Sequence, residues 1–203
     1  MLIDLSVPLN EKTPVYPGDS KTQIKTGSTF EKDGCQNHYV CISTHVGTHM
    51  DGPSHRLSGE KNIDEISLDR FSGRGVCIRV DNNQFDIEKI KQVHIQEGDI
   101  VLFHTGMSDR YYLLEYFNSY PDIPESVANY LVQKKIKIIG VDMCSPDHPP
   151  FPIHKILLKN NILIIENLAN LKSLVGKEFK IYAFPLKVSL DGSPVRVVAE
   201  IKS

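Results

Sequence analysis

The segment from His45 to His55 restricts the possible folds of this chain more than any other part of its sequence. It holds three histidines and one aspartate within eleven residues, together with two glycines, one proline and two β-branched residues. The spacing of His45 and His49 would place both on one face of a helix, but glycine, proline and β-branched residues disfavour a helix. We therefore expect a strand that runs into a tight loop, in which Gly47 permits an unusual backbone angle and Asp51 projects near the two imidazoles.

The residue types in this segment are those that bind divalent metals. Zinc and manganese accept imidazole nitrogen and carboxylate oxygen. His45, His49 and Asp51 lie within seven residues, and His55 is a fourth candidate. The alternative is that these are unrelated polar residues of a loop, which would be the better explanation of a single histidine. Three histidines around one aspartate favour a metal site.

The composition of the chain argues against several classes of protein. Its 203 residues suffice for one domain, residues 1–203, with a substantial core. Hydrophobic residues make up 40% and charged residues 24%, which is ordinary for a globular protein and argues against disorder. The 23 basic and 25 acidic residues give a net charge of -2, and no basic run stands out. Neither nucleic acid nor a membrane is therefore an expected partner.

The N-terminus and the cysteines indicate the cellular compartment. Residues 1–5 show no basic region ahead of a long apolar one, and no stretch approaches the ~20 apolar residues of a membrane span. The four cysteines are scattered without Cys-x-x-Cys spacing, which favours reduced thiols over a disulfide framework. We expect a cytoplasmic protein.

Strand-like and helix-like segments alternate along the chain. The expected strands are 1–6, 21–30, 37–45, 75–80, 98–103, 136–141, 162–165, 178–187 and 194–201. The expected helices are 86–93, 124–133 and 154–159. Strands interspersed with short helices predict an α/β domain.

The motif in the first segment is similar to a known one. His45-x-x-x-His49-x-Asp51-x-x-x-His55, with Gly-Thr and Pro inside it, resembles the signature of the cyclase family of metal-dependent hydrolases, which includes bacterial kynurenine formamidases, or arylformamidases. Weaker similarities follow in the family's order at 13–19, 98–106, 140–147, 185–187 and 192–196. The resemblance implies an α/β fold with a mixed, largely β sheet core and short peripheral helices, of the swivelling β/β/α type.

The resemblance also implies roles for single residues. His45 and His49 would bind a first metal ion, Asp51 and Glu166 would bridge two ions, and His154 would bind the second. His154 and Glu166 are twelve residues apart, like the family's two distal ligands. His154 alone could equally be a surface helix residue. Glu166 follows the apolar run 162–165, and a buried carboxylate is costly unless it binds a cation or another partner.

His55 would be the catalytic acid–base group of the same resemblance. The family chemistry uses metal-bound hydroxide to attack an amide or ester carbonyl, and His55 would give a proton to the leaving atom. The metal would be zinc, one or two ions per subunit, with manganese as an alternative. In formamidases the substrate is N-formyl-kynurenine, an intermediate of tryptophan catabolism.

The sequence departs from the formamidase pattern at the loop that binds the aryl group. The family commonly has Trp there, whereas this chain has no Trp and carries Tyr16 at that position. Tyrosine can still stack on an aromatic ring. Two alternatives therefore stand: an isatin hydrolase-like enzyme that opens a cyclic amide or lactone, and a non-catalytic metal- or ligand-binding protein on the same fold. His55 favours an enzyme, because a pure binding site needs no acid–base group.

The partners follow from the same resemblance. They are a small-molecule substrate and further copies of the chain, in a homodimer or homotetramer with the loop around Tyr16 near a neighbouring subunit's site. His148 is expected near the site. Lys187 and Arg196 are candidate anchors for a substrate carboxylate, although surface ion pairs explain them equally well.

Overall fold

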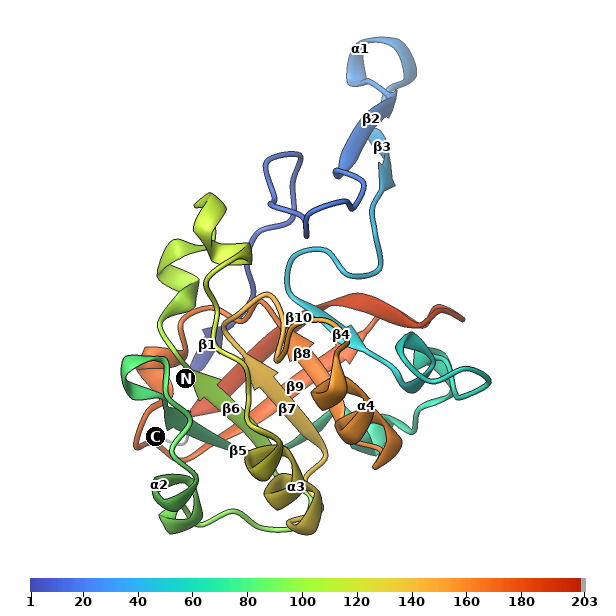
Figure 1. Cartoon of the computed structure of the whole chain (residues 1–203). Helices are drawn as coiled ribbons and strands as arrows, with labels where there is room; N and C mark the ends of the chain where they lie inside the picture. Colours follow the sequence, from blue (N-terminus) through green and yellow to red (C-terminus); the bar gives the residue numbers. More distant parts are fainter. Residues whose placement is uncertain (202–203) are drawn as a thin grey trace.

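The core of the molecule is a mixed sheet that closes on itself. The computed structural model describes residues 1–201. Eight strands follow the order β1-β10-β4-β8-β7-β6-β5-β9, and β10 also pairs with β9, which closes the barrel in Figure 1. The strands of the barrel are β1 Leu2–Asp4, β4 His49–Asp51, β5 Ser72–Arg79, β6 Ile100–His104, β7 Ile138–Val141, β8 Leu163–Glu166, β9 Phe179–Pro185 and β10 Gly192–Ile201. This architecture confirms the predicted α/β fold with a mixed, largely β core.

Four consecutive strands run parallel, and helices connect them. Strands β5, β6, β7 and β8 pair in sequence order. The connections carry α2 Ile87–Gln92, α3 Glu125–Gln133 and α4 Pro152–Lys159. Short 3-10 helices occupy other loops: η1 Pro53–His55, η2 Ile63–Glu65, η3 Leu68–Arg70, η4 Asp81–Asn83, η5 Met107–Arg110, η6 Leu114–Phe117 and η7 Leu171–Leu174. A parallel pair needs such a crossover, since the chain must return to the same end of the sheet.

The parallel strands are buried on both faces, which divides the core in two. Val101 and Phe103 of β6 pack in one cluster with residues of α2, α3 and α4. Ile100 and Leu102 of the same strand pack in a second cluster with residues of β9 and β10. Successive side chains of a strand point to opposite faces, so an uninterrupted apolar run is what a doubly covered strand requires.

A two-stranded hairpin stands away from the barrel. It consists of β2 Gln23–Ser28, the short helix α1 Phe30–Asp33 and β3 Asn37–Cys41, and we call residues 23–41 the arm. Figure 1 shows the arm projecting from the barrel, and it carries exposed apolar side chains such as Tyr39 at 68% and Val40 at 53%. Two strands alone are marginally stable in water. Within residues 1–201, no helix has the length and apolar character needed to cross a membrane.

The predicted elements are found, with one correction around the histidine segment. Every strand and helix range expected from the sequence overlaps an element of the same type. The expected order within the segment was wrong, because the turn precedes the strand. Gly47 takes a φ of 62°, and the strand β4 begins after it at His49. The reason is that β4 is fixed from both sides, by β8 and by β10.

Candidate metal centre

Strands β4 and β8 bring three of the expected ligands together. His49 and Asp51 are two residues apart on β4, so their side chains share one face. The antiparallel register sets His49 directly opposite Glu166, the last residue of β8. The three residues are 2%, 1% and 6% exposed. A histidine and two carboxylates are thus buried together by strand pairing.

His45 approaches the same carboxylates from the turn before β4. Its Nδ1 lies 2.8 Å from Asp51 Oδ1. The left-handed conformation of Gly47 makes the turn, which a larger residue would strain. Gly192 of β10 leaves room for the imidazole, since a Cβ at that position would lie 2.9 Å from His45 Cε1. Two glycines therefore determine where His45 lies.

His154 reaches the cluster from helix α4. Its Nδ1 lies 2.5 Å from Asp147 Oδ1, and the other oxygen of Asp147 accepts a hydrogen bond from the backbone N–H of Ile153. Because Nδ1 is held in this way, the other ring nitrogen, Nε2, faces the cluster. It lies 3.3 Å from Glu166 Oε1 and 3.5 Å from Asp51 Oδ2. A carboxylate behind a histidine ring is the usual support of a metal ligand.

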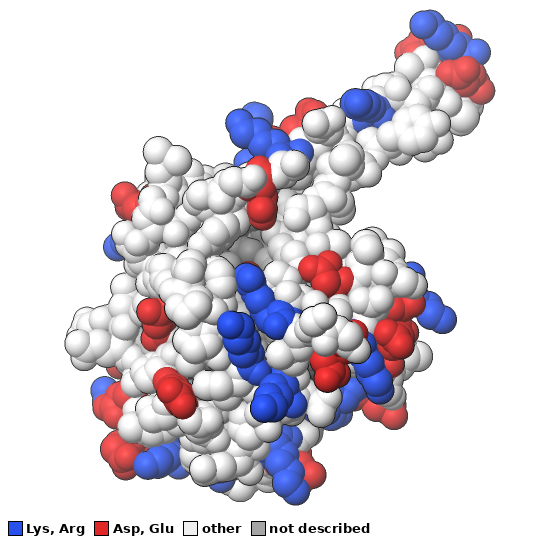
Figure 2. All heavy atoms as spheres, turned by 45° about the vertical axis from the view of Figure 1, so that its right-hand side comes forward, with Lys and Arg blue, Asp and Glu red and all other residues white. Residues whose placement is uncertain are grey.

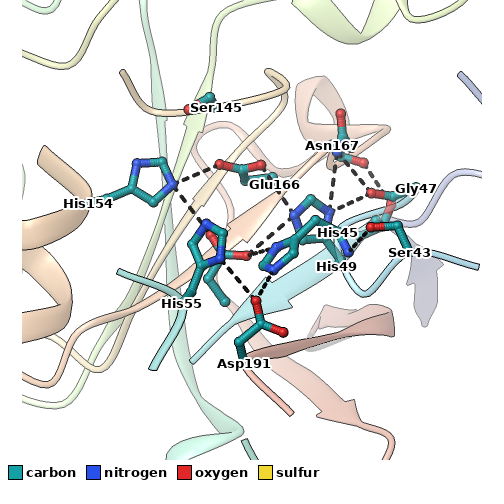
Figure 3. A network of polar contacts seen from close by, with 12 residues as sticks. Ser43, His45, Gly47, His49, His55, Ser145, His154, Glu166, Asn167 and Asp191 are labelled. Carbon is teal, nitrogen blue, oxygen red and sulfur yellow. Dashed lines mark hydrogen bonds and ion pairs between the residues drawn. The ribbon is translucent and has the colours of Figure 1, made fainter. Parts of the chain in front are cut away.

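Asp51 and Glu166 each face histidines on two sides. Asp51 Oδ1 lies 3.4 Å from His49 Nε2, on the same side as His45, whereas Oδ2 faces His154. Glu166 Oε2 lies 3.3 Å from His49 Nε2, whereas Oε1 faces His154. Figure 3 shows Glu166 between His49 and His154. Two carboxylates between two groups of histidines would suit a pair of metal ions.

The unsatisfied atoms of the cluster fit a divalent metal. His49 Nε2 and Asp51 Oδ2 are buried without a hydrogen-bond partner within residues 1–201. Such atoms destabilise a fold unless something binds them. The ligand atoms of His45, His49 and Asp51 lie within 4.8 Å of one another, and their nitrogen and oxygen donors suit zinc or manganese.

The histidines and carboxylates of the cluster shift one another's pKa. Burial lowers the pKa of His45 and His49, but Asp51 and Asp191 together outweigh burial at His45 and raise its pKa to about 9. The neighbouring carboxylates of Asp51 and Glu166 raise the pKa of His49 to about 10. Burial opposes ionisation of the two carboxyls, yet the histidines hold the pKa of Asp51 and of Glu166 below its usual value. Protons therefore occupy the metal-free cluster where a cation would bind.

His55 is joined to the cluster through Asp191, a residue that the sequence analysis missed. Asp191 Oδ2 lies 3.2 Å from His55 Nδ1 and 2.8 Å from His45 Nε2. The His45 and His55 rings lie 4.0 Å apart, and burial lowers the pKa of His55. The one signal for Asp191 is its position directly before the family-like segment 192–196.

The contacts of His55 allow more than one role. Its ligand atom lies within 4.8 Å of those of Asp51 and His154, which is close enough for a shared metal. Its hydrogen bond to Asp191 is equally typical of an acid–base group held in place by a carboxylate. The structure therefore places His55 at the centre, and its role stays a prediction.

The cluster lies at a pocket of about 200 Å³. Tyr16, Phe117, Phe151 and Arg56 line it together with the histidines. The ring of Tyr16 meets that of Phe117 edge-on at 6.2 Å. Figure 2 shows the surface hollowed below the base of the arm, with basic side chains beside the hollow. Tyr16 therefore lies where a substrate-binding residue is expected.

Three further residues named from the sequence lie outside the pocket lining. His148 stacks on Tyr120 with the ring centres 4.0 Å apart, and its Nδ1 lies 2.7 Å from Asp122. Arg196 forms an exposed ion pair with Asp4 at 2.7 Å. Neither Arg196 nor Lys187 lines the pocket, and the ion pair of Arg196 fits the surface explanation, whereas the anchoring role stays a prediction.

Comparison with known proteins agrees with this fold. The uncharacterized protein MJ0783 of Methanocaldococcus jannaschii is 38% identical over 188 residues, which cover 91% of each chain. The kynurenine formamidase of Bacillus thuringiensis (strain Al Hakam) is 30% identical over 206 residues, or 97% of this chain and 95% of that protein. The structure of isatin hydrolase A from Labrenzia aggregata matches with a TM-score of 0.89 at 26% identity, covering 100% of this chain and 94% of that one. Residues 3–148 match the family Cyclase, and this chain therefore belongs to it.

Proposed function

We propose that this chain is a metal-dependent hydrolase that cleaves the C–N bond of an aryl amide, with N-formyl-kynurenine as the first substrate to test. The cluster of histidines around Asp51 and Glu166 carries the proposal, because it offers a buried metal-ligand set at the floor of an open pocket. The aromatic side chains of Tyr16 and Phe117 at the same pocket suit an aryl group. The similarity to a kynurenine formamidase supports the choice of substrate.

Five side chains would hold the metal, and they are those of His45, His49, Asp51, His154 and Glu166. When bound, a divalent ion activates water and polarises the scissile carbonyl. The chain's own contribution is to hold these side chains in place before binding. Asp147 fixes the ring of His154, and the β4–β8 register fixes His49 against Glu166.

His55 would move the proton in this reaction. Asp191 holds its Nδ1, which leaves Nε2 to receive a proton and to pass it to the leaving nitrogen. Imidazole suits this role because it exchanges protons near neutral pH. The products would be formate and the free aryl amine.

Two variants test the division of roles. The His49→Ala variant is expected to lose metal, whereas His55→Ala is expected to keep its metal and to lose turnover by about 10²- to 10⁴-fold. Elemental analysis measures the metal, and formate release from N-formyl-kynurenine measures turnover. His148→Ala is the matched control, since this histidine also pairs with an aspartate but lies outside the pocket lining. Equal loss of metal from His55→Ala and His49→Ala would make the acid–base role wrong.

A second candidate substrate is a cyclic amide or lactone. The isatin hydrolase from Labrenzia aggregata has the same fold at 26% identity, and the loop residue Tyr16 departs from the formamidase pattern. Hydrolysis of isatin or a lactone by a protein that leaves N-formyl-kynurenine intact would select this candidate. A metal-loaded protein that hydrolyses none of them would instead be a binding protein.

The metal and the assembly are part of the same proposal. We expect zinc, as one or two ions per chain, with manganese as the alternative. The carboxylate of Asp51, which faces His49 on one side and His154 on the other, supports two ions. We also expect a homodimer or homotetramer, because the arm exposes apolar side chains that a second chain would cover.

A further inference from the structure

Arg56 brings a positive charge into the pocket beside the proposed proton-transfer group. It follows His55 directly and lines the same pocket as the metal-binding histidines. The sequence alone gave no reason to single this residue out, because no recognised motif includes it.

The guanidinium of Arg56 has no acidic partner within residues 1–201. Three of the other arginines form ion pairs, Arg74 with Asp99, Arg79 with Asp81 and Arg196 with Asp4, and Arg70 donates to backbone oxygens. The Nε of Arg56 is buried and has no hydrogen-bond partner within the same range. Arg56 as a whole is partly exposed and lines the pocket, so the rest of its guanidinium is open to the acceptor oxygens of a ligand.

The aromatic surroundings orient this charge. The guanidinium carbon of Arg56 lies 4.0 Å from the centre of the Phe151 ring. Stacking uses the face of the guanidinium and leaves its N–H groups, which lie in the plane, to bind a carboxylate through two parallel hydrogen bonds. Phe151 in turn meets His154 edge-on at 5.6 Å, so the arginine is tied to the metal centre by one ring.

Neither acidic residue that lines the pocket forms an ion pair with Arg56. Glu166 is engaged by His49 and His154. Asp19 also lines the pocket, but it is exposed and forms no ion pair with Arg56. A ligand that fills the pocket can therefore satisfy the arginine without competing with an existing contact.

We propose that Arg56 anchors the substrate and that the substrate is an aryl amide bearing a carboxylate. This inference rests on the proposed function, because it names the substrate class of the same site. The aryl group lies among Tyr16, Phe117 and Phe151, the carboxylate binds Arg56, and the scissile carbonyl faces the metal-binding cluster. Arg56 is thereby a specificity residue, distinct from the ligands and from His55.

Matched substrates with and without the carboxylate test the proposal. The three isomers of formamidobenzoate carry it, and formanilide is the neutral reference. In the Arg56→Met variant, an unbranched side chain can still cover Phe151 but has no charge. The ratio of kcat/KM for the best formamidobenzoate to that for formanilide is expected to fall by about 10- to 100-fold, mainly through KM. Arg56→Lys should restore part of the ratio.

The control is Arg110→Met, an exposed arginine outside the pocket lining, which should leave the ratio unchanged. If Arg56 only holds Phe151 in place, Arg56→Met reduces both rates alike and the ratio stays constant, which overturns the proposal. A ratio near one in the wild-type protein overturns it as well, while leaving the hydrolase function intact.

Equilibrium binding separates the inference from the proposed function. Benzoate and benzamide, titrated into the metal-loaded and the metal-free protein by calorimetry, probe Arg56 without turnover. The preference for benzoate should persist without metal and disappear in Arg56→Met. If the wild-type protein hydrolyses none of the formamides, the hydrolase proposal fails, yet an Arg56-dependent preference for benzoate still supports the anchor. Equal binding of the two probes overturns it.

Discussion

At the scale of single residues, the candidate metal centre is built from groups that compensate for one another's burial. Asp51 and Glu166 would be costly to bury alone, and so would the protonated forms of His45 and His49. Together they are held by mutual attraction, with the carboxyl pKa values lowered and the histidine pKa values raised. A metal ion would take over the role that protons play in the metal-free protein.

The raised histidine pKa values predict that metal binding releases protons. His45, with a pKa of about 9, and His49, with a pKa of about 10, hold protons at neutral pH in the metal-free protein. A proton must leave each nitrogen before it binds metal, so affinity rises as pH increases toward about 9 to 10 and falls as pH decreases. His154 adds a third proton if a second ion binds, because carboxylates also raise its pKa.

Calorimetry of zinc binding in buffers with different ionisation enthalpies measures this release. We expect about two protons for one ion at His45 and His49, and about three when His154 also binds. A His154→Gln variant should remove the third proton only, whereas His148→Gln should change nothing. Zinc binding without proton release would contradict the assigned ligands.

At the scale of elements, the site depends on how closely three strands approach one another. Strand β4 is three residues long and lies between β8 and β10. Gly192 begins β10 opposite Asp51, and a Cβ there would lie 2.8 Å from the backbone oxygen of Met50 and 2.9 Å from His45 Cε1. The absent side chain thus makes room for a ligand.

The Gly192→Ala variant is therefore expected to weaken metal binding. The added methyl group meets a backbone oxygen that cannot move freely, so β10 or His45 must shift. We expect metal affinity to fall by about 10-fold or more with the fold retained, measured by zinc titration and circular dichroism. Gly73→Ala on β5 is the control, because its Cβ would meet nothing closer than 3.3 Å and lies in another part of the barrel. Unchanged affinity in Gly192→Ala would show that His45 does not need this space.

The same strands show how far the sequence could predict the fold and the site. Strand-like composition predicted the strands of the barrel except β4, and ligand spacing together with family resemblance predicted the residues that the structure brings together. The pairing of β4 with both β8 and β10 was not predictable, because register depends on long-range contacts that leave no local pattern. Asp191 and Arg56 were missed for the same reason, since their roles arise from neighbours distant in sequence or from an absent partner.

At the scale of the whole molecule, the arm joins the pocket to the outer surface. Residues on both sides of the arm, Tyr16 and Ser43, line the pocket. A contact that fixes the position of the arm therefore also affects the entrance to the pocket. Strands β2 and β3 pair only with each other among the described residues. Tyr39 is 68% exposed and Val40 is 53% exposed. A hairpin of this kind is stabilised when a partner covers it.

We accordingly predict that a second copy of the chain covers the arm. Sedimentation of the wild-type protein should show a dimer or a larger homo-oligomer, and the double substitution Tyr39→Asp and Val40→Asp should shift it toward the monomer, because it places charge on the apolar surface. Gln23→Asp is the matched control on the same hairpin, since it adds a charge at an exposed polar position.

The monomeric variant should also show a raised KM, because Tyr16 and Ser43 flank the arm, while its metal content stays unchanged. A wild-type protein that sediments as a monomer at assay concentration would contradict the prediction, and a monomeric double variant with unchanged KM would separate the assembly from the pocket.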